Sequence, residues 1–389
     1  MLLAACACAV ATRKLSAEPL RLRADAVTES RAPAGLVILE GQDKVRPWLY
    51  AEGLVWTGAR SDPTGDPSAD VLVLAVRLRE PGGLGELRGG RFVVSTGAIR
   101  PVQIDGVHAL GRAPWQTTTV EAFAGAPVVP RFGTTGYDWL GGGRIAQSLA
   151  ERATVGASYV QRRSHRDIAD DELGLDLAAV PVRWLDLAAR SAYDLTSPGI
   201  ADALVSAAAR ISRVRVELFA SHRSPSRLLP ATSLFSVLGD FPSQMVGSTL
   251  RWEAAPRLDV LASGAGQHVG GEYGGNGWVR ALLRTDDRGL GSLGLEGRRQ
   301  DVSTAKWTGI RALASLPLGR GFRYATELEL VLPDAPRGRG FAWPWALAAL
   351  SWRSGTGWEV AGATEASSSP EHRYELNALL RVSRTLELR

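Results

Sequence analysis

Alternation of apolar and charged side chains with a period of two is the feature that most constrains the fold of this chain. In residues 184–195 apolar or aromatic side chains recur at every second position, and the intervening positions carry Asp186, Arg190 and Asp194. Such a segment forms a β-strand with one apolar and one charged face. The same rhythm returns as far as residue 383, interrupted by clusters of Gly, Pro, Asp and Ser. The sequence therefore predicts an all-β protein.

The charged face decides between a soluble and a membrane architecture. In residues 374–382 the apolar positions alternate with Glu375, Asn377 and Arg381. Neighbouring charges of both signs along one face are costly in a dry core, but they suit a hydrated channel wall. This pattern favours a single closed antiparallel transmembrane β-barrel over the alternative, a soluble β-sandwich or propeller.

The number of strands follows from the length of the chain. The alternation marks about 22 candidate segments, of which some are expected to be loops or halves of one bent strand. A membrane-spanning strand with its turns takes roughly 20 residues. We therefore predict about 16–18 strands in one domain, residues 18–389, and an aqueous lumen unless a plug fills it.

The first 17 residues differ from the rest of the chain. Both cysteines, Cys6 and Cys8, lie in an Ala-rich apolar segment that precedes Arg13 and Lys14. This segment is typical of the end of a secretory signal, although a basic region before it is missing. We assign residues 1–17 to a leader. The residues up to Cys6 also fit a lipoprotein cleavage box, which would place a lipid on Cys6.

Composition excludes two other classes of protein. The mean hydropathy is −0.04, and no apolar run approaches the roughly 18 residues of a membrane-spanning helix. The net charge is +5, yet the basic residues are dispersed along the strands, so we predict no nucleic-acid partner. Arginine supplies nearly all of the positive charge, and an arginine-rich lumen favours anionic or polyol solutes.

Tryptophan placement also suggests a bilayer. Most tryptophans fall near the ends of the predicted strands, where an indole ring can sit at the height of the lipid headgroups. We interpret them as an interfacial girdle. Its members are Trp56, Trp139, Trp184, Trp252, Trp278, Trp307, Trp343, Trp345, Trp352 and Trp358.

The longest departure from the alternation is residues 221–242, which contain three prolines and several apolar side chains. A loop of this length either faces the medium or folds inward to narrow the pore. In the second case Arg223 and Arg227 would line a constriction. Both alternatives stay open at this point.

Catalytic and metal-binding patterns are weak. The five histidines show no metal-ligand spacing, so we predict neither a metal nor a cofactor. Ser221 and His222 are adjacent, and neighbouring strand residues point to opposite faces. We therefore predict that the chain is not an enzyme.

Two hairpin-like phrases, Gly89–Phe92 and Arg100–Val107, resemble those of porin-like outer-membrane β-barrel proteins, and the resemblance extends over residues 20–389. It implies the outer membrane of a Gram-negative bacterium, lipid contacts and a pore for polar or anionic substrates. Polysaccharide export with a periplasmic export protein, a general diffusion porin and an occluded structural or adhesive barrel are the alternatives. Oligomeric state is not predicted. The expected pore-lining residues are Arg21, Arg23, Asp25, Asp186, Arg190, Asp194, Arg280, Arg284, Arg323, Glu327, Glu329, Glu375 and Arg381.

Overall fold

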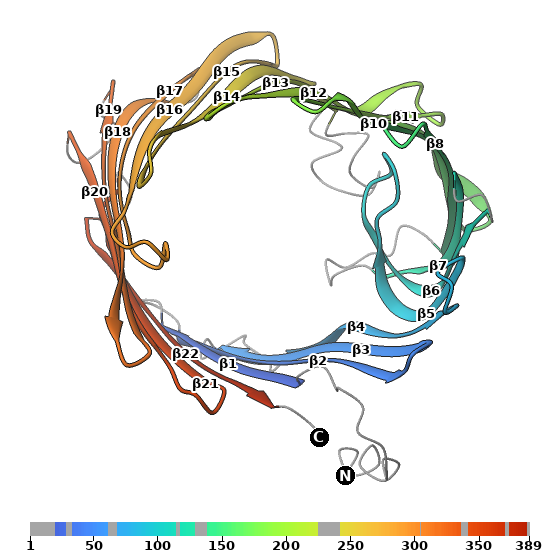
Figure 1. Cartoon of the computed structure of the whole chain (residues 1–389), viewed down its shortest axis with the longest axis horizontal. Helices are drawn as coiled ribbons and strands as arrows, with labels where there is room; N and C mark the ends of the chain where they lie inside the picture. The colour runs from blue at the N-terminus through green and yellow to red at the C-terminus, as the bar shows by residue number, and fades with distance from the viewer. Residues whose placement is uncertain are drawn as a thin grey trace.

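The computed structural model of the chain is a closed ring of antiparallel strands (Figure 1). It describes residues 20–28, 33–60, 68–113, 117–128, 138–224, 242–303, 305–335, 341–369 and 373–386. The predicted leader, residues 1–17, lies outside these ranges. Within them, no helix is long and apolar enough to cross a membrane.

The strands follow one another along the chain with short connections. Their bounds are β1 Leu20–Thr28, β2 Pro33–Arg46, β3 Leu49–Arg60, β4 Ser68–Arg79, β5 Gly85–Val94, β6 Val102–Arg112, β7 Thr118–Pro127, β8 Trp139–Leu149, β9 Ala153–Ser164, β10 Asp167–Val182, β11 Leu185–Asp194, β12 Gly199–Ile211, β13 Val214–Arg223, β14 Ser243–Ala255, β15 Leu258–Val269, β16 Glu272–Arg284, β17 Ser292–Val302, β18 Ala305–Gly319, β19 Phe322–Pro333, β20 Trp343–Arg353, β21 Trp358–Ser367 and β22 Glu375–Leu386.

Hydrogen bonding closes the ring. Each strand pairs with its neighbours in sequence, and β1 pairs with β22 in a register that places Asp25 opposite Arg381. The sheet has 22 strands, so the predicted number of 16–18 was too low. The estimate assumed too many residues per strand, because several connections are minimal. Only Ser212 and Arg213 join β12 to β13, with Ser212 in the left-handed region at φ 54°.

The even number of strands places the start of β1 and the end of β22 at the same end of the ring. We call it the terminal end. The connections there include the two-residue turns after β12 and β14. Longer connections, such as residues 224–242 between β13 and β14, join the strands at the far end.

One face of the ladder is apolar although it is exposed. Large side chains on it include Leu74, Val246 and Ile211, which are 64%, 66% and 68% exposed. A water-soluble sheet would bury such a face, whereas a membrane barrel turns it toward lipid. The alternation therefore reflects lipid on one side and water on the other.

Three strands bend sharply into the ring. Gly90, Gly106 and Gly125 are direct neighbours across β5, β6 and β7. A Cβ on Gly106 would lie 2.2 Å from the carbonyl oxygen of Ala124, and one on Gly90 would lie 2.2 Å from that of Leu74. Only glycine permits this close approach of the backbones. In Figure 1 the connected ends of β5 and β6 leave the wall and lie inside the ring.

We call the inward-folded segment, residues Phe92–Ile104, the inner flap. Its side chains Phe92, Ile99 and Ile104 are at most 4% exposed and pack in one cluster with Leu140 of β8 and Val160 of β9. Burial of large apolar side chains stabilises the docked position by a few kcal/mol each, about 1.5–3. The flap is therefore a fixed part of the fold.

The bend also shortens the contact between β4 and β5. Their ladder runs only from Leu74 opposite Arg91 to Arg79 opposite Glu86, and the beginning of β4 has no β5 partner. Side chains replace the missing backbone donors. The Arg91 guanidinium donates to the carbonyl oxygen of Val71 at 3.0 Å, and the Gln103 amide donates to that of Leu72 at 2.5 Å.

Candidate functional site

The charged face of the ladder is the inner face of the ring. The inner flap, which lies inside the ring, contacts it at two places (Figure 1). Thr96 donates to Glu121 of β7 at 2.5 Å, and Arg100 lies 3.0 Å from Glu172 of β10. Residues that pair directly across two strands lie on the same face of the sheet. The strand register therefore shows which residues of all the other strands lie on the inner face.

Under the flap, the inner wall carries buried charges. Glu172 is 1% exposed and lies between Arg100 of the flap and Arg162 of β9, at 3.0 and 3.4 Å. Asp170 contacts the same two arginines. A buried carboxylate with two guanidinium partners is stable only while both pairs are made. These ions fasten the flap to the wall.

The opposite wall carries an ion-pair network built around Glu296, which is 1% exposed, while its partners Arg280 and Arg298 are 32% and 26% exposed. Arg280 Nε lies 2.6 Å from Glu296, which also contacts Arg298. Arg298 reaches Glu329 at 3.0 Å, and Arg311 contacts Glu327. This network crosses four strands, β16 to β19. It consists of Arg280, Glu296, Arg298, Arg311, Glu327 and Glu329.

Other predicted wall arginines are also paired. Arg284 lies 2.6 Å from Asp259, and Arg190 lies 3.7 Å from Asp202. Arg323 donates to the Ser315 hydroxyl at 2.9 Å. The sequence predicted a wall of arginines mixed with carboxylates, and in the structure Arg190, Arg280 and Arg284 each face a carboxylate. The reason is that acidic residues share the inner register with them.

The remaining predicted residues fall at various heights of the same face. Asp194 does not extend into the lumen, because it is 7% exposed and accepts backbone hydrogen bonds from Thr196 and Ser197. Glu375 lies opposite Ser367, and Arg381 opposite Asp25. In the backbone register of β1, Arg21 pairs with Thr385 and Arg23 with Ser383. Asp186 lies opposite Ala208.

The two residues of the predicted constriction loop, Arg223 and Arg227, have different outcomes. Arg223 belongs to strand β13 and lies 3.4 Å from Asp202, so it is a wall residue. Arg227 lies outside the described residues. Among the described residues, the inner flap is a segment that does fold inward, and its signal was the glycines at 90 and 106, which come opposite each other in adjacent strands.

A membrane girdle requires indoles on the outer face, and only some of the predicted girdle tryptophans lie there. The register puts Trp139, Trp252, Trp352 and Trp358 on the outer face, and Trp184 lies in the connection from β10 to β11. The others share the inner face with the charges. They are Trp56, Trp278, Trp307, Trp343 and Trp345.

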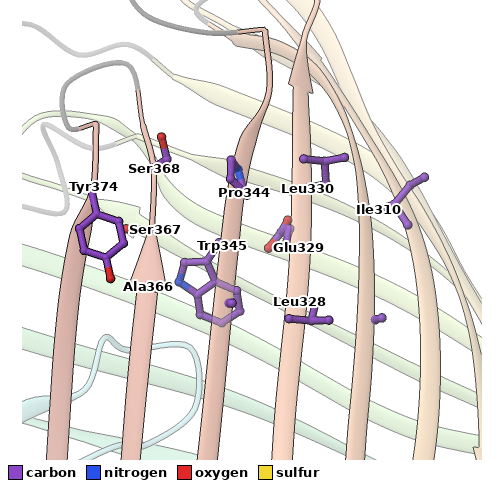
Figure 2. A pocket seen from close by; sticks show the side chains of 12 residues that line it. Ile310, Leu328, Glu329, Leu330, Pro344, Trp345, Ala366, Ser367, Ser368 and Tyr374 are labelled. Atoms are coloured by element: carbon purple, nitrogen blue, oxygen red, sulfur yellow. The ribbon is translucent and has the colours of Figure 1, made fainter.

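The outer face holds an apolar groove of about 510 Å³ over β18 to β22 (Figure 2). Ile310, Leu328, Leu330, Pro344 and Tyr374 line it. The groove is shallow and faces lipid, which is the expected surroundings of such side chains. It also touches Glu329 and Trp345, whose side chains are paired with the inner-face residues Arg298 and Glu365.

Acidic side chains cap two turns at the terminal end. Asp286 accepts hydrogen bonds from the backbone N–H groups of Leu290, Gly291 and Arg288, which hold the pKa of its carboxyl below the usual range. Glu80 accepts from Gly82 and Leu84, with the same effect on its pKa. Both carboxylates stabilise their turns only while they are ionised.

In the part of the chain that the structure describes, no group of His, Cys, Asp and Glu is arranged to hold a metal ion. Ser221 and His222 are consecutive residues of β13, so their side chains point to opposite faces. These residues form no catalytic pair with each other.

Comparison with known proteins identifies the fold. The P pilus usher PapC translocation pore superimposes with a TM-score of 0.59 at 10% identity, over 95% of this chain and 99% of that one. An E. coli P pilus tip assembly intermediate containing PapC, PapD, PapK and PapG gives 0.54 at 10% identity, over 96% and 61%. Pseudomonas aeruginosa OccK5 gives 0.43 at 12% identity, over 95% and 98%. No protein-family model and no curated protein matches the sequence.

The fold is that of a porin-like outer-membrane β-barrel, as the sequence predicted. It agrees with the predicted location in the outer membrane of a Gram-negative bacterium. Its specific features are the inner flap on one wall and the ion-pair network around Glu296 on the other.

Proposed function

We propose that this chain forms a pore in the outer membrane that passes polar solutes. The observation that carries the proposal is the division of the closed sheet into an apolar exposed outer face and an ionic inner face. On the inner face of β16 to β19 the arginines Arg280 and Arg298 stay partly exposed, although Glu296 between them is buried. An ionic wall of this kind is stable only in contact with water.

The pairing of charges sets the expected selectivity. Each arginine of the network faces a carboxylate, so the wall offers donors and acceptors but little net potential. Such a wall favours neutral polar solutes over strong selection of anions. This modifies the expectation of an anion-preferring lumen, which rested on the abundance of arginine.

The inner flap supports a restricted pore. It occupies part of the lumen and is anchored by buried ions and by the apolar cluster of Phe92, Ile99 and Ile104. Because the flap is fixed, it narrows the passage permanently on one side. An occluded structural barrel would instead require the remaining lumen to be filled.

Conductance of the purified protein in planar bilayers tests the proposal. We expect stable ion-conducting steps with a reversal potential close to zero in a salt gradient, because the wall charges cancel. A seal at all voltages would contradict the proposal and favour the occluded alternative. Strong anion selectivity would contradict the assignment of a neutral wall.

Two finer predictions stay open. Export of a polysaccharide, with a periplasmic export protein as partner, is compatible with a wide polar lumen, but pull-down of such a partner from the periplasm would be needed to support it. The prediction that the chain is not an enzyme stays a prediction as well.

A further inference from the structure

Four tryptophans lie on the inner face of the wall opposite the flap. We call Trp278, Trp307, Trp343 and Trp345 the indole track. They lie in β16, β18 and β20, which are every second strand, and each is half-buried. Neighbouring strands are about 4.8 Å apart, so the track advances in steps of about 10 Å across the wall. Because barrel strands are tilted, this path climbs obliquely along the pore.

The ring of Trp307 is laid flat against the sheet. A Cβ on Gly309, two residues along the same strand, would lie 3.1 Å from Cζ3 and 3.5 Å from Cε3 of the indole. The missing side chain of Gly309 therefore leaves the space that the ring covers. A ring held flat on the wall turns one π face toward the lumen.

Charged side chains lie beside two of the other indoles, Trp278 and Trp345. The Arg280 guanidinium lies 5.3 Å from the ring centroid of Trp278. The Trp345 N–H donates to Glu365 at 2.7 Å. Trp278 and Trp345 thus each have a charged neighbour, whereas the buried Nε1 of Trp343 has no hydrogen-bond partner. The ion-pair network crosses β16 to β19, among the strands that carry the tryptophans.

Apolar rings on a water-facing wall have a cost, since each exposes apolar surface that a ligand could cover. A pyranose ring has a C–H face that stacks on an indole and a rim of hydroxyls that bond to guanidinium and carboxylate groups. Aromatic platforms beside planar charged groups match both parts of that chemistry.

We propose that the indole track binds a linear neutral oligosaccharide and hands it along the wall of the pore. The proposal rests on the proposed pore and names its substrate class. A neutral sugar is chosen because the arginines beside the track, such as Arg298 and Arg311, are already paired with Glu296, Glu329 and Glu327. No free positive charge of the network is left for an acidic sugar.

The test is the blocking of ion current by maltohexaose in planar bilayers. We expect saturable interruptions with the natural chain and at least a tenfold weaker block with the double variant Trp278→Ala/Trp307→Ala. Trp252→Ala/Trp352→Ala, which removes two outer-face indoles, is the matched control and keeps the block. An acidic trisaccharide of galacturonate should block more weakly than maltohexaose.

Three results would overturn the proposal. They are ion steps without any sugar block, an equal block in the double variant, and a stronger block by the acidic sugar. Should no ion current appear, the pore itself fails, and calorimetric titration of the detergent-solubilised chain with maltohexaose decides the binding site separately. Heat of binding that disappears in Trp278→Ala/Trp307→Ala supports the track, and no heat contradicts it.

Discussion

The ion pairs under the inner flap join two separate segments, whereas those of β15 to β20 join neighbouring strands of the wall. Both walls present arginines and carboxylates on the inner face. Under the flap, Glu172 is 1% exposed and its arginine partners fasten one segment to another. Across the lumen Glu296 is also 1% exposed, but its partners Arg280 and Arg298 belong to the wall strands themselves and are 32% and 26% exposed.

The difference shows that the same residue types serve two purposes in one barrel. A covering segment converts wall charges into structural ion pairs, because it removes water from them. Away from the flap the ion pairs join neighbouring wall strands and leave Arg280 and Arg298 partly exposed, although Glu296 between them is buried. The glycines at 90, 106 and 125 create this difference, since they let β5 to β7 bend inward.

The largest expected effect comes from Glu172→Gln under the flap, compared with the same change at Glu329 on the other wall. Glu172→Gln leaves Arg100 and Arg162 with Asp170 alone, so we expect a loss of about 3–5 kcal/mol in the free energy of unfolding. Glu329→Gln should cost less, because Arg298 keeps Glu296 as a partner, and should shift the pore toward anions. Denaturant unfolding in micelles and reversal potentials measure the two effects. Equal destabilisation by both changes would remove the distinction between the walls.

A slightly smaller effect is expected from the apolar cluster of the flap. Ile104 is fully buried, so Ile104→Ala should destabilise the chain by about 2–5 kcal/mol and widen the pore where the flap loosens. Leu295 on the outer face is 59% exposed, and Leu295→Ala serves as the control. Unfolding curves and single-channel conductance report both changes. A loss as small as that of the control would show that the flap is not docked.

The smallest effect concerns a turn outside both walls. The pKa of Asp286 is lowered, so its ionised form stabilises the folded turn above about pH 4. That contribution is lost as the pH falls through the folded pKa. We expect Asp286→Ala to be less stable than the natural chain at neutral pH, with the two converging in acid. A difference that is constant over pH would contradict this role of the carboxylate.

Much of the fold could be predicted from alternation alone. The predicted strand at 374–382 corresponds to β22, Glu375–Leu386, with Glu375 and Arg381 on the inner face, as the pattern indicated. The alternation marked about 22 segments, which is the number of strands in the sheet. The lower prediction of 16–18 came from assuming roughly 20 residues per strand with its turns, although several turns are only two residues long. The flap was missed because a bend depends on glycines that become neighbours only through strand pairing.

The misplaced tryptophans show a signal that was present but not used. Trp278 and Arg280 are two residues apart in one strand, so they must share a face. We had assigned Trp278 by its position near a strand end, although its parity places it with the charges. Ion pairing, by contrast, could not be predicted, since Arg280 and Glu296 meet only through the register of two strands.

The central claim is that the charged face lines the lumen and the apolar face meets lipid. Single cysteines at neighbouring positions, Glu329→Cys and Leu328→Cys, test it most directly in a chain whose Cys6 and Cys8 are removed. A charged, water-soluble methanethiosulfonate reagent should modify position 329 and lower the current, while position 328 reacts only with a lipid-soluble maleimide. The reverse pattern, or equal reactivity with the charged reagent, would contradict the account.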